Sequence, residues 1–216
     1  TKLRECLCSL EEILRLAKGT PVSLEVIGTN YEDIVYEGKQ LYKKFNGVAK
    51  NVFIKIPVDP CMDKKNSNDL DGIRAIKTLS KLKIPINSTL IFTPEQALLS
   101  AKAGARFVSP YVGREDDFIK FKKNKNKNFK DNGISSGVDL IKKCSELFIK
   151  NKIKTEILAA SIRDTRHLFE VSMAGADIAT VPLKILKDSV KHYKTLEGMK
   201  EFSKDSVKEY KNLIYN

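Results

Sequence analysis

The strongest constraint on the fold is the alternation of short apolar strands with amphipathic helical segments along the chain. Runs rich in Val, Ile and Leu recur between segments whose apolar residues repeat at helical spacing. Strands that are apolar on both faces and separated by helices form parallel sheets covered by helices. The sequence therefore predicts an α/β fold.

The predicted elements run through all 216 residues. This length suits one large domain or two small ones, and we predict a single domain over 1–216 with a Lys/Asn-rich inserted loop at 118–133. The predicted strands are 21–27, 51–57, 86–92, 106–109, 154–161 and 177–182. The predicted helices are 3–17, 31–45, 69–83, one from Pro94, 136–151, 164–174 and those from about 184 to the end.

The strands could build a doubly wound open sheet or a (β/α)8 barrel. The chain has no Gly-x-Gly-x-x-Gly or Walker-type loop, which weakens the nucleotide-binding open sheet. Polar residues near the carboxyl ends of five strands share the side opposite the aliphatic residues, which is the interior and active-site mouth of a barrel. We therefore predict a TIM (β/α)8 barrel with six of its eight strands in this chain; the alternative is polar core residues satisfied separately. The residues concerned are Glu25, Lys55, Asn87, Thr89, Ser109 and Ser161.

Lys55 stands in the apolar strand-like run 51–57. Burial disfavours its charged form, and a neutral lysine is a nucleophile towards carbonyls. The alternative is a lysine whose stem packs on apolar surface while its ammonium reaches water. The other polar residues of the predicted rim favour the chemical interpretation.

The net charge of +12 could indicate a nucleic-acid partner. However, the six lysines from 120 to 130 alone equal half of this net charge. A Lys/Asn tract of low complexity cannot build a packed core and is typical of a solvated loop. Phe121 and Phe129 are too few for a base-stacking platform. We expect no nucleic-acid partner; a patch for RNA or another polyanion is the alternative.

The cysteines predict neither a disulfide scaffold nor a metal site. Cys6, Cys8, Cys61 and Cys144 lack the spacing of either, and the chain has two histidines. We expect idle or buried thiols, no metal, and a cytoplasmic protein. No apolar run approaches the roughly 18 residues of a membrane span, so we expect no membrane segment.

The predicted rim carries the groups that Schiff-base chemistry needs. Lys55 would attack a ketone and form an iminium, while Glu25 with Thr89 would hold the water that transfers protons. Three residues of two later loops resemble a clamp for an anionic group of the substrate. These residues are Arg114, Ser161 and Arg163.

At these positions the chain resembles the transaldolase family, specifically its small bacterial and archaeal branch. The likeness covers nearly the whole chain, and its motifs are specific in combination. The matching segments are 21–26, 52–57, 87–92, 96–104, 108–114, 155–163 and 174–182.

The resemblance implies a class I transaldolase of the pentose phosphate pathway, with no cofactor or metal. It would move a dihydroxyacetone unit between sugar phosphates: fructose 6-phosphate, erythrose 4-phosphate and sedoheptulose 7-phosphate. By resemblance, Lys55 is the Schiff-base lysine, and Glu25 and Thr89 hold the catalytic water. Asn87 and Ser109 fall on substrate contacts, and the phosphate site takes Arg114, Ser161 and Arg163. The likeness also suggests a homo-oligomer in which the C-terminal helix (199–215) packs on a neighbour.

Three departures from the family pattern keep alternatives open. The family's first two strands, one ending in a catalytic Asp and the next carrying Thr-Thr-Asn-Pro, have no match here, so we expect an N-terminally incomplete barrel. The segment after Arg114 is longer and more basic than usual. Tyr111, which we count among the substrate-binding residues, stands where typical transaldolases have Phe. It resembles the fructose 6-phosphate aldolases, whereas Glu25 and Ser109 favour transfer. Aldol cleavage and a degenerate, non-catalytic barrel are the alternatives.

Overall fold

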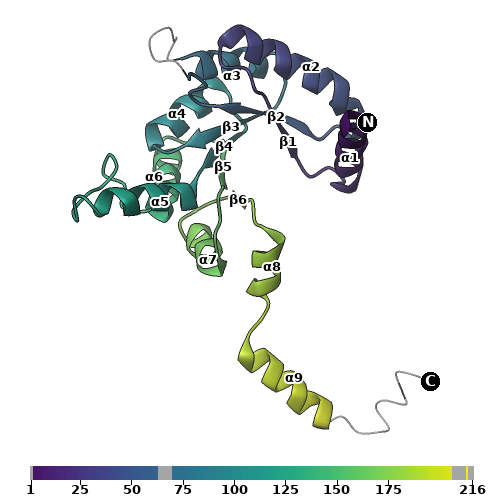
Figure 1. The fold of residues 1–216 in the computed structure, drawn as a ribbon, viewed down its shortest axis with the longest axis vertical. Coiled ribbons are helices and arrows are strands. Elements are labelled where there is room, and N and C mark those ends of the chain that lie inside the picture. The colour runs from purple at the N-terminus through teal and green to yellow at the C-terminus, as the bar shows by residue number, and fades with distance from the viewer. Residues whose placement is uncertain (1, 63–69, 206–212, 214–216) are drawn as a thin grey trace.

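The computed structural model describes residues 2–62, 70–205 and 213 (Figure 1). Within them, six strands form one parallel sheet whose strand order follows the chain order. The sheet curls without closing, so β1 and β6 are its two edges in the described part of the chain. The strands are β1 (Val22–Glu25), β2 (Val52–Pro57), β3 (Ile86–Ile91), β4 (Phe107–Pro110), β5 (Glu156–Ala159) and β6 (Ile178–Ala179).

Helices alternate with these strands and cover the outer side of the curl (Figure 1). The architecture is therefore an open, TIM-barrel-like α/β fold, which confirms the predicted fold class and the six strands. The helices of the described residues are α1 (Lys2–Leu16), α2 (Tyr31–Ala49), α3 (Asp71–Lys81), α4 (Pro94–Ala103), α5 (Val112–Lys123), α6 (Gly137–Lys150), α7 (Thr165–Met173), α8 (Leu183–Ser189) and α9 (Tyr193–Asp205).

The hydrophobic core lies between the outer face of the sheet and the helices. Alternate strand residues such as Ile54, Ile86 and Ile157 are almost fully buried there. Because successive side chains of a strand point to opposite faces, the intervening residues face the inside of the curl. This alternation places Lys55, Asn87 and Ser109 on the concave side, as the sequence predicts, whereas Ser88 faces the helices and bonds to Ser100 of α4.

The structure corrects two predicted boundaries. The segment 118–133 is not a loop throughout, because α5 continues to Lys123. An acidic first turn and three lysines in the last turn of α5 complement the helix dipole, and this signal could have predicted the helix. The predicted strand 177–182 shortens to the two residues of β6.

The rest of the Lys/Asn segment is anchored at its base. The ring of Phe129 meets that of Phe118 edge-on, with centroids 5.9 Å apart. Ile134, which follows the lysines, is fully buried. The segment therefore projects from the barrel surface, Phe129 and Ile134 hold it there, and its lysines point outward.

The C-terminal part leaves the barrel body. Figure 1 shows α9 extending away from the sheet, and within the described residues this helix buries none of its side chains. Most of the predicted helix 199–215 beyond α9 lies outside the described residues. No helix in the described part of the chain combines the length and the apolar character that crossing a membrane requires.

The prediction of idle or buried thiols can be compared with the structure only at the cysteines whose side chains it describes. Cys144 of α6 is fully buried, and burial raises the pKa of its thiol to about 12. A thiol with that pKa stays protonated and inert at neutral pH. The side chains of Cys6 and Cys8 lie outside the described residues.

Candidate active site

Strand register brings three of the predicted site residues into one row. Glu25 of β1 pairs with Lys55 of β2, and Lys55 pairs with Asn87 of β3. Because residues in register on parallel strands point to the same face, their side chains stand next to one another on the concave side. Glu25, Lys55 and Asn87 thus share one face of the sheet, as their alternate positions along the strands predict.

The ammonium of Lys55 lies among polar groups. Its Nζ is 3.1 Å from Oε2 of Glu25 and 3.4 Å from the hydroxyl of Tyr111. The Lys55 side chain is 21% exposed, so its head neither sits in an apolar pocket nor extends into open solvent. An amine held between a carboxylate and a phenol has groups beside it that can exchange protons.

Tyr111 connects the lysine to β3. The residue follows β4 directly and precedes the first turn of α5. Its hydroxyl accepts a hydrogen bond from Oγ1 of Thr89 at 3.3 Å, and its ring lies against that of Phe92. Thr89 is fully buried and therefore orients Tyr111 from beneath the site.

Asn87 is held by hydroxyl groups on both sides. Its amide nitrogen donates to Oγ of Ser23 at 3.0 Å, and Oγ of Ser109 donates to its amide oxygen at 2.7 Å. Two hydroxyl groups thus hold the plane of the Asn87 amide between β1 and β4. Ser23 was not among the predicted site residues. It lies two residues before Glu25, so its side chain points to the same face of the strand, and this alternation could have revealed it.

A cavity of about 630 Å³ lies on the concave side, within the size range of small-molecule sites. Three polar residues that were not predicted, Thr20, Ser23 and Thr180, contribute to its wall. Thr89 acts through Tyr111 and does not line it. The six predicted site residues that line the cavity are Glu25, Lys55, Asn87, Ser109, Tyr111 and Ser161.

The two predicted arginines follow residues of the cavity wall in the sequence, but their side chains do not line the cavity. The guanidinium of Arg114 stacks on the ring of Tyr111, 5.1 Å from its centroid. Arg163 donates from Nη2 to Asp117 of α5 at 2.8 Å, and both side chains of this pair are more than half exposed. The structure therefore joins Arg114 to the site through Tyr111, while Arg163 points outward to α5.

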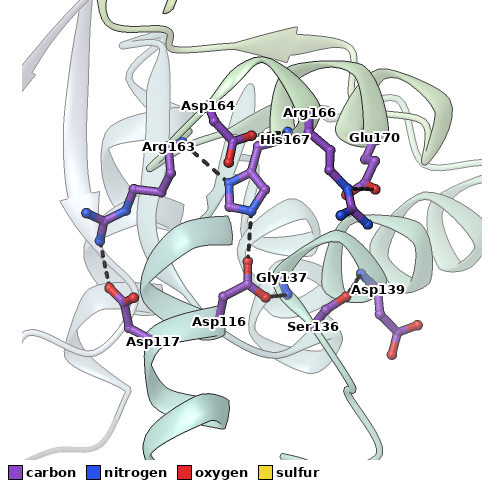
Figure 2. Close-up of polar contacts among 10 residues, drawn as sticks. All are labelled: Asp116, Asp117, Ser136, Gly137, Asp139, Arg163, Asp164, Arg166, His167 and Glu170. Atoms are coloured by element: carbon purple, nitrogen blue, oxygen red, sulfur yellow. Dashed lines mark hydrogen bonds and ion pairs between the residues drawn. The ribbon is translucent and has the colours of Figure 1, made fainter.

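The turn that carries Arg163 is bound to the start of α5. Backbone N–H groups of Val112 and Gly113 donate to the carbonyls of Ala160 and Ser161 at 2.9 and 3.0 Å. A Cβ at Gly113 would lie 2.5 Å from the Ser161 carbonyl oxygen, so glycine is needed for this approach. Figure 2 shows the polar contacts between this turn, α5 and α7.

The described residues hold no group of three or more His, Cys, Asp or Glu side chains arranged to bind a metal ion. The wall of the cavity offers an amine, a carboxylate, a phenol and hydroxyl groups. This set suits covalent catalysis on a carbonyl compound.

Comparisons with known proteins agree with this geometry. The family model described as Transaldolase/Fructose-6-phosphate aldolase matches residues 5–214. A protein of Thermoplasma acidophilum named "Probable transaldolase" is 41% identical over 196 residues, which cover 91% of this chain and 74% of that protein. A protein of Carboxydothermus hydrogenoformans with the same name is 43% identical over 194 residues, which cover 90% of this chain and 77% of that protein. The chain thus belongs to the Transaldolase/Fructose-6-phosphate aldolase family.

Proposed function

We propose that this protein is a transaldolase that transfers a dihydroxyacetone unit between sugar phosphates through a Schiff base on Lys55. The observation that carries the proposal is the position of Nζ in the cavity wall, in contact with both Glu25 and Tyr111. The names of the relatives support a reaction of the transaldolase type.

The first step joins the lysine to the donor ketose. The unprotonated amine of Lys55 attacks C2 of the ketose, and the carbonyl oxygen takes up a proton to give a carbinolamine. Loss of that oxygen as water leaves an iminium. Glu25, 3.1 Å from Nζ, is the group that accepts the amine proton and returns it to the leaving water.

The iminium then draws the electrons of the C3–C4 bond. Cleavage needs a base for the proton of the C4 hydroxyl, and it releases an aldose phosphate while the three-carbon fragment stays on Lys55 as an enamine. Glu25, which touches Nζ, is the candidate proton carrier for this step. Asn87, oriented by Ser109, would bind the hydroxyl groups of the fragment.

The last step separates transfer from cleavage. In a transaldolase the enamine attacks the aldehyde of a second aldose phosphate, and hydrolysis frees the longer ketose. With fructose 6-phosphate as donor and erythrose 4-phosphate as acceptor, the products are glyceraldehyde 3-phosphate and sedoheptulose 7-phosphate. These sugars, the pentose phosphate pathway, a cytoplasmic location, a single barrel domain and a homo-oligomer are parts of the proposal.

The phosphate groups of both sugars need a cationic site near the cavity. Ser161 lines the cavity, Arg163 follows it two residues later, and the Arg114 guanidinium lies over the ring of Tyr111 in the cavity wall. The ion pair of Arg163 with Asp117 is exposed, and such pairs contribute little, about 0–1 kcal/mol. A substrate phosphate can therefore replace Asp117 as the partner of Arg163 at small cost.

Aldol cleavage of fructose 6-phosphate is the second candidate, and Tyr111 favours it. The Tyr111 hydroxyl contacts both Lys55 and Thr89, so it belongs to the reacting cluster. A phenol there can protonate the enamine to an iminium, which water then hydrolyses to free dihydroxyacetone and the Lys55 amine. The two activities differ in whether turnover needs an acceptor.

The test uses the full-length protein with fructose 6-phosphate, with and without erythrose 4-phosphate, and chromatographic detection of products. We expect sedoheptulose 7-phosphate to form only with the acceptor present, and Lys55→Met to abolish it. Lys39→Met, a change at an exposed lysine of α2, is the matched control and should retain activity. Free dihydroxyacetone at the same rate without acceptor would establish the aldolase instead. Equal turnover by Lys55→Met and the original protein would refute the Schiff base.

A further inference from the structure

The turn from Ser161 to Arg163 has an unusual backbone that needs support. Ser161 adopts a left-handed conformation, with φ of +62°, which is uncommon for a residue with a side chain. Its carbonyl accepts from Gly113, which fixes one side of the turn. The other side is the backbone N–H of Arg163, and this group is bound by a side chain of α7.

That side chain is His167 (Figure 2). Its Nδ1 accepts from the Arg163 N–H at 3.4 Å, and its Nε2 is 3.2 Å from Oδ2 of Asp116 in α5. The imidazole is 17% exposed. Because Nδ1 acts as an acceptor, a neutral ring carries its proton on Nε2, where it faces the carboxylate.

Asp116 is itself held in place. Its Oδ1 accepts from the backbone N–H of Gly137, the first residue of α6, at 2.8 Å. A Cβ on Gly137 would lie 2.2 Å from the carbonyl oxygen of Val112, so α6 begins directly against the start of α5. The carboxylate thus ties α6 to His167 and, through the imidazole, to the turn after β5.

We propose that His167 and Asp116 are a positioning pair that sets the Ser161–Arg163 turn for the phosphate group of the substrate. This inference rests on the proposed function, because it assigns the turn to phosphate binding. Neither side chain lines the cavity, so the pair acts through the backbone of Arg163 and not on the reacting atoms. A turn held from both sides presents Ser161 and the Arg163 side chain at fixed positions, which lowers the ordering cost of binding.

The proposed role of the pair predicts different results for four substitutions. His167→Ala removes both contacts. His167→Asn keeps an amide oxygen where Nδ1 stood, so it can still accept from the Arg163 N–H. Asp116→Asn can turn an amide N–H towards Nε2, which favours the opposite tautomer and places a proton opposite the Arg163 N–H. Arg166→Gln is the matched control, because Arg166 pairs with Glu170 on the exposed side of the same helix.

The first measurement compares kcat and KM for fructose 6-phosphate and for fructose, the same donor without the phosphate. We expect His167→Ala and Asp116→Asn to raise KM for fructose 6-phosphate about tenfold, the scale of one lost hydrogen bond. The kcat of these two variants for fructose 6-phosphate and their kcat/KM for fructose should stay within about twofold of the original values. His167→Asn and Arg166→Gln should resemble the original protein with both donors. A general structural defect would instead lower kcat for both donors and would overturn the inference.

The second measurement does not depend on turnover. Inorganic phosphate is titrated into the ¹⁵N-labelled full-length protein while the backbone amide of Ser161 is followed by NMR. We expect this signal to shift, with a Kd about tenfold weaker in His167→Ala than in Arg166→Gln. If His167→Ala fails to fold, Asp116→Asn against His167→Asn gives the same comparison.

The outcomes separate the two proposals. Phosphate binding that depends on His167, in a protein with no transfer or cleavage activity, would refute the proposed function and retain the positioning pair. Activity on fructose 6-phosphate with unchanged KM and unchanged phosphate affinity in Asp116→Asn and His167→Ala would refute the positioning pair alone. Absence of any phosphate effect on the Ser161 amide would also overturn it.

Discussion

Glu115 offers a quantitative test of the physical account of α5. This first-turn residue is 1% exposed, and its Oε1 has no hydrogen-bond partner among the described residues. Burial, and then the nearby carboxylates of Asp131 and Asp116, raise the pKa of Glu115 from 4.5 to about 7. The folded protein therefore binds a proton at Glu115 more tightly than the unfolded chain does.

The sign and size of the effect follow from this pKa. Stability from the protonated Glu115 is fully present below pH 4.5 and is lost as the pH rises through about 7. The difference between the two pKa values corresponds to about 3 kcal/mol in the free energy of unfolding. Glu115→Gln carries no charge at any pH and should escape this loss.

The assay is urea unfolding of the original protein and Glu115→Gln at pH 5 and pH 8. We expect the variant to gain up to about 3 kcal/mol on the original between these pH values. Glu32→Gln, at an exposed acid in the first turn of α2, is the control and should show little of this gain. Parallel pH dependence of the original and Glu115→Gln, within about 0.5 kcal/mol, would refute the reasoning.

Three further changes test the surroundings of the cavity. Tyr111→Phe removes the hydroxyl that contacts Lys55, so release of free dihydroxyacetone should fall about fivefold while transfer to erythrose 4-phosphate is retained, as product analysis can show. Loss of transfer would contradict this. Gly113→Ala places a Cβ 2.5 Å from the Ser161 carbonyl, so thermal unfolding should reveal a loss of about 1–3 kcal/mol and KM for fructose 6-phosphate should rise. An unchanged Tm would argue against the close approach. Asp117→Asn weakens the pair with Arg163, so phosphate should bind up to about fivefold more tightly by NMR titration; weaker binding would mean that Asp117 orients the arginine.

The sequence predicts the sheet and its inner face well, because both depend on periodicities that every strand repeats. Parity placed Glu25, Lys55 and Asn87 on one side, and parallel register made them neighbours. Tyr111 was expected near the substrate from the family resemblance. Its contact with Lys55 depends on the path of the chain after β4, which parity cannot give.

The orientation of long side chains was beyond sequence reasoning. Arg163 could reach either the cavity or α5, and Asp117 as its partner became visible only in the structure. The Lys/Asn composition after α5 predicts a loop and masks the helix signal of Glu115 in its first turn. A single histidine in a helix, such as His167, carries no signal of its role until its neighbours across the fold are known.

The most direct test of the central claim is borohydride trapping. The full-length protein is incubated with fructose 6-phosphate and reduced, which converts an iminium into a stable secondary amine, and its peptides are analysed by mass spectrometry. We predict a three-carbon or six-carbon substrate adduct on the peptide containing Lys55, and no adduct in Lys55→Met. An adduct on a different lysine, or turnover without any adduct, would contradict the assignment of Lys55 as the Schiff-base residue.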